Sequence, residues 1–241
     1  MENAIVIDGL KKEYGKRAAV NAISLNVEQW TLFSLLGVNG AGKTTTIKML
    51  TGLTKPTSGE AYVMGRSINT ELAKVKKLVS VSPQETAVAP NLTVRENLEF
   101  IAGIYGMDRK HVREKTDELV REFSMEEVEK SKAKTLSGGW QRRLSIAMAL
   151  ITEPKILFLD EPTLGLDVIA RRELWQIINS VKKNVTIVLT THYMEEAEKL
   201  SDKVAVMVKG EVKAVGTVSE LLQRTGKQNL EEAFVSIVGV E

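Results

Sequence analysis

The sequence contains no cysteine, no long apolar run and no marked excess of either charge. Without cysteine there is no disulfide framework, and a reducing compartment is compatible with the composition. No apolar run approaches the ~20 residues that a membrane-spanning helix needs. The first ten residues, MENAIVIDGL, lack the basic and long apolar regions of a signal peptide. These absences predict a soluble cytoplasmic chain that reaches a membrane only through a partner.

The charge balance excludes a further class of function. The 33 basic and 31 acidic residues leave a formal net charge of +2. A protein that binds nucleic acid through its surface carries a clear basic patch or excess. We therefore expect no nucleic-acid partner.

Short apolar runs alternate with helical patterns along much of the chain. With 241 residues, of which 43% are hydrophobic, the chain can bury the core of one large domain. Four β-rich runs have the continuous apolar character of strands buried on both faces, and they cover residues 31–37, 77–84, 155–162 and 185–192. This alternation predicts an α/β domain with a mostly parallel sheet.

Other segments depart from that pattern. The stretch before about Trp30 predicts a small antiparallel sheet, and residues 203–216 predict a hairpin that turns at Lys209 and Gly210. Strand signals vanish in the middle of the chain, where Thr93 and Glu96 form the pattern of a capping box. We expect an antiparallel β subdomain (residues 1–30) and a core in two pieces (residues 31–88 and 151–215). Between these pieces lies an inserted helical subdomain (residues 89–150), and a helical tail follows (residues 216–241).

The stretch GVNGAGKTT, residues 37–45, follows the first buried strand and precedes a helical pattern. It fits the phosphate-binding pattern G-x-x-x-x-G-K-[ST] in the strand-to-helix context that this motif requires. Backbone N–H groups of such a loop surround a phosphate chain, and the helix N-terminus adds its positive dipole end. We expect Lys43 to neutralise the β- and γ-phosphates of a bound nucleotide and Thr44 to hold Mg²⁺. The residues expected to bind the nucleotide are Asn39, Gly40, Ala41, Gly42, Lys43, Thr44 and Thr45.

An acidic pair ends the apolar stretch ILFLDEP. A strand that ends at Asp160 places this carboxylate at the carboxyl edge of the sheet, beside the phosphate loop. Asp160 is expected to reach Mg²⁺ through water, and Glu161 to orient and deprotonate the attacking water. Phosphoryl transfer depends mainly on positioning and charge neutralisation, which this pair is suited to provide.

Gln84 and His192 end two further predicted strands. Taken singly, each is more simply a surface polar residue. Together, at the same edge of one sheet, they are interpreted as site residues: Gln84 contacts Mg²⁺ and water, and His192 donates a hydrogen bond to the γ-phosphate. Tyr14 has two equal interpretations, an aromatic face for an adenine ring or a tyrosine packed in a turn.

The stretch LSGGW raises a separate question, because two glycines begin a helix at a cost of about 1 kcal/mol each. Ser137 is a good N-cap, and Gly138 and Gly139 leave the first helical N–H groups uncovered, which makes an anion-binding helix start. This start is an ordinary cap, a site for another ligand, or a clamp on the same γ-phosphate. Sequence physics alone favours the ordinary cap.

In their order along the chain, these motifs resemble those of ATP-binding-cassette (ABC) ATPases: the phosphate loop, Gln84, LSGGW, ILFLDEP, LGLD and His192. The likeness covers nearly the whole chain. It implies a single domain with a P-loop NTPase core, a mostly parallel sheet, an N-terminal antiparallel β subdomain and an inserted helical subdomain. It also implies that Ser137, Gly138 and Gly139 contact the ATP of a second, antiparallel subunit. Tyr14 then stacks on adenine, and Asp167 of LGLD runs along the interface.

Trp140 departs from the family pattern, because the signature usually has Gln at this position. Two interpretations have equal weight: Trp140 alters the contact near the partner's nucleotide, or it only packs against the helical subdomain.

The stretches VAPNLTVRENLEFIAGIYGM and NLEEAFVSIVG look like the branch that energises export of drugs, antibiotics, sodium or polysaccharides. Residues 85–105 would line the groove for a membrane subunit, although most of their apolar side chains also fit a subdomain core.

The resemblance implies an ATP-hydrolysing subunit that closes as a homodimer or heterodimer around two ATP, with Mg²⁺, and drives a separate integral-membrane subunit. It would lie at the cytoplasmic face of the cell membrane, and the membrane subunit would select the substrate. One alternative is a soluble ABC ATPase that acts on nucleic acid or the translation machinery, but the chain has no coiled-coil or zinc insertion. Another is a binding module without turnover, against which Glu161 and His192 argue.

Overall fold

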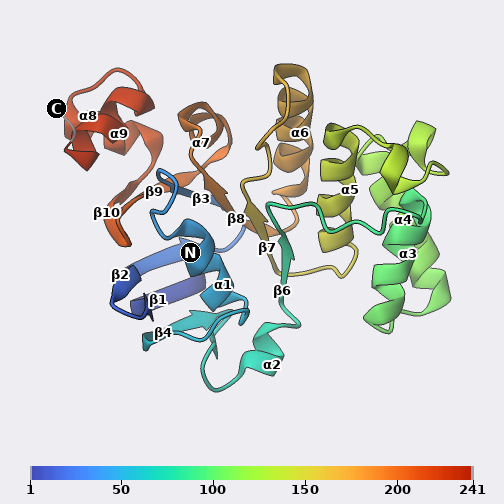
Figure 1. The fold of residues 1–241 in the computed structure, drawn as a ribbon, viewed down its shortest axis with the longest axis horizontal. Coiled ribbons are helices and arrows are strands. Elements are labelled where there is room, and N and C mark those ends of the chain that lie inside the picture. Colours follow the sequence, from blue (N-terminus) through green and yellow to red (C-terminus); the bar gives the residue numbers. More distant parts are fainter. Residues whose placement is uncertain (1, 240–241) are drawn as a thin grey trace.

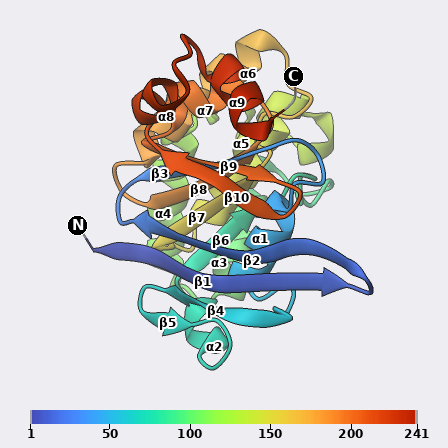
Figure 2. The same ribbon diagram turned by 90° about the vertical axis from the view of Figure 1, so that its left-hand side faces the viewer.

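The computed structural model describes residues 2–239. Its strands form a four-stranded antiparallel sheet and a six-stranded, mostly parallel sheet, with helices around them (Figure 1). Figure 2 shows the antiparallel sheet on one side of the six-stranded sheet and the helices of the C-terminal tail on the other. The predicted α/β class is confirmed. Within residues 2–239 no helix has the length and apolar character to cross a membrane.

The six-stranded sheet carries most of the predicted site residues at one edge. Its order is β10-β9-β3-β8-β7-β6, and every pairing is parallel except that of β9 with β10. Strands β3, β7 and β8 are buried throughout, as their apolar sequences predict. The strands are β3 (Leu32–Leu36), β6 (Val79–Ser82), β7 (Ile156–Asp160), β8 (Thr186–Thr191), β9 (Lys203–Val208) and β10 (Glu211–Gly216). Parallel strands place their carboxyl ends at one edge.

The antiparallel sheet is larger than the sequence predicts. Besides β1 (Asn3–Tyr14) and β2 (Arg17–Glu28), it contains β4 (Ser58–Val63) and β5 (Arg66–Ser67), in the order β2-β1-β4-β5. Residues 58–67 were expected in the core, so this boundary was wrong. The backbones of β1 and β4 approach so closely that a Cβ on Gly59, where φ is +81°, would lie 2.1 Å from the carbonyl oxygen of Gly9. Only glycine fits there.

The first core helix lies between the two sheets. Helix α1 (Lys43–Leu50) contributes Ile47, Met49 and Leu50 to an apolar cluster that also contains Phe33 of β3 and Val20 of β2. The short α2 (Leu72–Val75) follows β5. Because α1 packs on both sheets, the loop that precedes it is held between them.

The middle of the chain forms the predicted helical subdomain, at the right of Figure 1. It contains α3 (Val94–Ile104), α4 (Arg109–Glu122), two 3-10 turns (Glu126–Val128 and Ala133–Thr135) and α5 (Gly138–Leu150). The capping box of Thr93 and Glu96 at the start of α3 is confirmed. Helix α5 packs against both α3 and the core strand β6, so it joins the subdomain to the sheet.

The remaining helices cover the other parts of the core. They are α6 (Val168–Val181), α7 (Met194–Leu200), α8 (Val218–Thr225) and α9 (Leu230–Val238). Helix α7 packs against α6 and α9. The predicted hairpin of β9 and β10 is confirmed, and Lys209 and Gly210 both have positive φ, at 49° and 83°, as a tight two-residue hairpin turn requires.

Candidate active site

A cavity of ≈590 Å³ lies at the carboxyl edge of the six-stranded sheet, beside the antiparallel sheet. It collects residues that are far apart in the sequence. Those predicted from the sequence are Tyr14, Asn39, Gly40, Ala41, Gly42, Lys43, Thr44, Thr45, Gln84, Glu161 and His192. The sequence analysis missed three further lining residues, Arg17, Ala19 and Leu164. Arg17 could have been found, because a cation at the start of the strand that follows the turn after Tyr14 suits an anionic ligand.

The loop between β3 and α1 forms one wall of the cavity. Gly42 precedes α1 with φ of +106°, and a Cβ at this position would lie 2.6 Å from the carbonyl oxygen of Ala19. No side chain caps α1. The first N–H groups of the helix are therefore free of side-chain acceptors, and with the helix dipole they form an anion-binding start.

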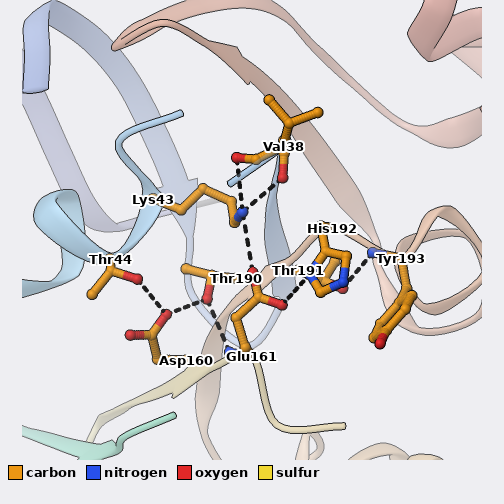
Figure 3. A network of polar contacts seen from close by, with 10 residues as sticks. Val38, Lys43, Thr44, Asp160, Glu161, Thr190, Thr191, His192 and Tyr193 are labelled. Carbon is orange, nitrogen blue, oxygen red and sulfur yellow. Dashed lines mark hydrogen bonds and ion pairs between the residues drawn. The ribbon is translucent and has the colours of Figure 1, made fainter. Parts of the chain in front are cut away.

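Lys43, the first residue of α1, is buried and directed into the site. Its Nζ donates hydrogen bonds to the carbonyl oxygens of Gly37, at 2.6 Å, and Val38, at 3.3 Å. It also forms an ion pair with Oε1 of Glu161, at 3.1 Å (Figure 3). A single ammonium therefore connects the loop to the acidic residue after β7.

Asp160, at the end of β7, makes contact with the start of α1. Its Oδ1 accepts hydrogen bonds from Oγ1 of Thr44, at 2.9 Å, and from Oγ1 of Thr190, at 2.5 Å. Figure 3 shows this group beneath Lys43. Carboxylate and hydroxyl oxygens are the donors that Mg²⁺ prefers in proteins. Within residues 2–239 no cluster of three or more His, Cys, Asp or Glu side chains forms a metal site.

Glu161 has an uncommon backbone conformation, with φ of +51°. The N–H of Glu161 donates to the backbone oxygen of Thr190, at 3.1 Å, and to the side-chain Oγ1 of Thr190, at 3.0 Å. These contacts stabilise the conformation. The side chain, 6% exposed, places Oε2 2.6 Å from Nδ1 of His192. Strained conformations of this kind cluster at functional sites. The carboxylate thus lies between a lysine and a histidine.

Gln84 lies two residues beyond the end of β6, so the predicted strand was too long. Pro83 has no N–H to continue the ladder. The carbonyl oxygens of Pro83 and Gln84 both accept from the guanidinium of Arg142, on α5. Burial lowers the pKa of Arg142, and the charge of Asp160 opposes this shift. The segment that carries Gln84 is therefore attached to the helical subdomain.

Tyr14 stands at the rim of the cavity, at the end of β1. Its side chain is 54% exposed, and Nζ of Lys12 lies 5.0 Å from the ring centroid. The structure thus places the ring at the cavity rather than within a packed turn.

Ser137, Gly138 and Gly139 do not line the cavity. Ser137 is the N-cap of α5, where its Oγ accepts from the N–H of Trp140 at 3.5 Å. Both Ser137 and Gly138 are exposed, and a Cβ on Gly138 would meet nothing within 4 Å. The cap that sequence physics favoured is present, and the open surface leaves room for a ligand from another chain.

Trp140 packs against the apolar cluster of the helical subdomain. The guanidinium of Arg143 lies 4.4 Å from its ring centroid and also pairs with Glu173 of α6. This packing agrees with one of the two interpretations, and a contact of Trp140 near the partner's nucleotide stays a prediction. Asp167 caps the neighbouring helix α6 by accepting from the N–H groups of Ile169 and Ala170.

A comparison with known families identifies the class. The family model described as "ABC transporter" matches residues 20–164. The chain therefore belongs to the ABC transporter family, as its motifs predict. It is an ATP-binding, ATP-hydrolysing domain of that family.

Two curated relatives and two solved structures illustrate the likeness. The human "Phospholipid-transporting ATPase ABCA3" is 44% identical over 87% of this chain, which spans only 12% of that protein. The "Linearmycin resistance ATP-binding protein LnrL" of Bacillus subtilis is 38% identical over 95% of this chain and 74% of its own length. An ATP-binding subunit of an ABC transporter superimposes with a TM-score of 0.86 at 29% identity, covering 97% of this chain and 99% of the other. A cassette dimer in a post-hydrolysis state with ADP and Pi gives 0.78 at 27% identity, covering 88% and 98%.

Proposed function

We propose that the chain hydrolyses Mg-ATP in this cavity as one half of a head-to-tail dimer, and that this cycle drives a separate membrane subunit. The observation that carries the proposal is the convergence of Lys43, Glu161 and His192 beside the phosphate loop. A lysine, a carboxylate and an imidazole in direct contact supply charge neutralisation, a general base and a hydrogen-bond donor.

Each of these side chains has a stated role. Lys43 moves its ammonium from Glu161 toward the β- and γ-phosphates. Glu161, once released, accepts the proton of the attacking water, and His192 holds the γ-phosphate with a donated hydrogen bond. Tyr14 supplies an aromatic face for the adenine ring at the rim.

The donor set fits Mg²⁺ together with the oxygens of a nucleotide. Mg²⁺ is commonly bound by one or two carboxylates, with phosphates and water completing the octahedron. Thr44, Asp160 and Gln84 would hold it, and it would neutralise phosphate charge. The hydrogen bond of Thr44 to Asp160 keeps both oxygens together before the ion arrives.

The second half of the site comes from a partner chain of the same class. Ser137, Gly138 and Gly139 lie outside the cavity at the N-terminus of α5, where Ser137 and Gly138 are exposed and Gly139 lies close to Ala170 of α6. A head-to-tail partner would place these residues against the γ-phosphate. The solved cassette dimer with ADP and Pi supports dimer formation by a chain of this fold.

ATP turnover at different protein concentrations tests the dimer. Because each site needs residues of two chains, the rate per chain should rise with concentration and then reach a plateau. Lys43→Ala should abolish ATP turnover at every protein concentration. A rate per chain that is constant down to nanomolar protein would contradict a shared site.

The membrane partner would dock on the helical subdomain, at the cytoplasmic face of the membrane. Phe100, Ile104 and Tyr105 at the end of α3 are each more than half exposed, as a docking surface for an apolar partner segment requires. The drug-resistance role in the name of LnrL supports export. Phe100→Asp should leave the ATPase activity of the purified chain intact but abolish its sedimentation with stripped membranes from its own source. Equal sedimentation of both proteins would contradict this docking site.

A further inference from the structure

A fully buried acid lies behind the site, and the proposed chemistry does not use it. Glu196 is on α7, four residues after His192, and its exposed fraction is 0%. Among residues 2–239 no lysine, arginine or histidine lies within ion-pair distance of it. Burial raises the pKa of Glu196, although the nearby side chains of Thr191, Thr163 and Trp175 oppose the shift. Burial without a cationic partner disfavours the charged form of such an acid, so hydrogen bonds to neutral groups are what hold it in place.

Glu196 joins α7 to α6. Its Oε1 accepts a hydrogen bond from Nε1 of Trp175, at 3.1 Å, and both groups are buried. Its Oε2 has no partner, and neither has the buried Oγ1 of Thr163, although Thr163 is among the groups that act on this carboxyl. Thr163 lies two residues after Glu161. Two buried polar groups without a partner are therefore associated with the chain just after Glu161, where each is costly unless it is hydrogen-bonded.

A second contact holds the same segment to α6. Arg171, one helical turn before Trp175, places its guanidinium 4.7 Å from the ring centroid of Tyr193. That ring lies 4.1 Å from the imidazole of His192, the pair visible at the right of Figure 3. Arg171 also donates to the carbonyl oxygen of Leu166, at 3.3 Å. Helix α6 thus contacts the segment after His192 at two points. Arg171 contacts Tyr193, and Trp175 contacts Glu196.

We propose that Glu196 is a positioning residue for ATP hydrolysis, which sets the place of His192 relative to Glu161 by joining α7 to Trp175 of α6. This inference rests on the roles proposed above for Glu161 and His192. Their side chains meet at 2.6 Å, and misplacing a reacting group by about 1 Å costs ~10²-fold in rate. A residue that fixes this geometry therefore acts on turnover and leaves nucleotide binding to the phosphate loop.

Two variants of Glu196 separate positioning from charge. Glu196→Gln keeps the acceptor for Trp175 and should retain kcat within about threefold. Glu196→Leu keeps the volume but removes the acceptor, and should lower kcat about 10- to 100-fold with KM for ATP unchanged. An unchanged kcat in Glu196→Leu would overturn the proposal. So would an equal loss in Glu196→Gln, because that result would require a charged carboxylate.

Trp175→Phe removes the other partner and keeps an aromatic side chain in the core. It should lower kcat in the same direction as Glu196→Leu, also without a change in KM. If the two variants lower kcat no further than they lower the folded fraction, the role of Glu196 is structural and the proposal fails.

The imidazole resonances of the folded protein report position directly, because the chain has only two histidines. In Glu196→Leu the signals of His192 should shift while those of His111, on α4, stay unchanged. A lower kcat with unmoved His192 signals would overturn the positioning role. Glu161→Gln serves as the reference: if it turns over normally, the proposed function fails, whereas a loss there with full activity in Glu196→Leu defeats this inference alone.

Discussion

The ammonium of Lys43 and the carboxylate of Glu161 form a buried ion pair, with Nζ 3.1 Å from Oε1 and each side chain less than a tenth exposed. Buried charges of this kind persist when each has its partner, and removing one partner leaves the other uncompensated. The phosphates of ATP are the alternative partner for the lysine. In the proposed mechanism, nucleotide binding releases the carboxylate at the moment when a general base is needed.

Glu161→Gln tests this exchange. The amide cannot accept the proton of water, so turnover should fall roughly 10²–10⁴-fold. Affinity for ATP should not weaken, because Lys43 loses a competing anion. Titration with a fluorescent ATP analogue and phosphate-release kinetics measure the two effects, and an ATP-dependent dimer should accumulate in size-exclusion chromatography. Turnover equal to that of the unaltered chain would remove Glu161 from this role.

Trp140→Gln restores the usual residue of the signature and tests the packing of Trp140. The indole packs on the subdomain cluster and under Arg143, so its loss should lower the free energy of unfolding by about 2 kcal/mol. Turnover of the folded protein should stay within a few-fold. Thermal denaturation of the ATP-free monomer checks the first expectation. An unchanged midpoint combined with a large loss of turnover would instead place Trp140 at the partner's nucleotide.

The contact of His111 with Glu153 predicts a pH-dependent link between α4 and the turn before β7. Nε2 of His111 lies 3.0 Å from Oε2 of Glu153, and this hydrogen bond raises the pKa of the histidine above its ordinary 6.5. A raised pKa gives stability that is complete below pH 6.5 and is lost as the pH rises through the higher folded value.

Thermal midpoints of the unaltered chain and of His111→Gln measure this contribution. The difference between the two proteins should be larger at pH 5.5 than at pH 8.5, and Glu153→Gln should reproduce it. A difference that grows toward alkaline pH would contradict the assignment.

Glu196 predicts a loss of stability with rising pH as well, in a lower pH range that starts at the ordinary pKa of an acid. Because burial raises its pKa above 4.5, the native state keeps a proton that the unfolded chain releases. Its contribution is therefore complete below pH 4.5 and is lost as the pH rises toward the folded value. Glu196→Gln has no such loss, so its stability relative to the unaltered chain should increase between pH 4.5 and 7.5 in urea unfolding. A difference that does not depend on pH would show that the acid is not neutral in the fold.

The sequence predicted the local features of this site because they depend on neighbours along the chain. The phosphate loop, the strand that ends at Asp160 and the capping box at Thr93 are of this kind. The strand order of the antiparallel sheet is not, because β4 pairs with β1 through a close backbone approach at Gly59 that no periodicity reveals.

Buried polar contacts were equally inaccessible to sequence reasoning. Glu196 lies in the charged stretch MEEAEKL, which is typical of an exposed helix. Only the packing of α6 against α7 brings Trp175 over it. Arg142 likewise resembles a surface arginine in the sequence, and its contact with the segment of Gln84 depends on how α5 meets β6.

The central claim is that one ATP is bound by Lys43 of one chain and Ser137 of another, and ATP binding to the isolated monomer tests it most directly. Equilibrium binding is measured at protein concentrations below dimer formation, for Lys43→Ala and Ser137→Arg. Lys43→Ala should weaken binding strongly, because the ammonium belongs to the cavity of its own chain. Ser137→Arg should bind ATP as the unaltered monomer does, yet fail to dimerise or turn over. If Ser137→Arg instead weakens monomer binding as much as Lys43→Ala does, Ser137 serves its own nucleotide and the shared site is contradicted.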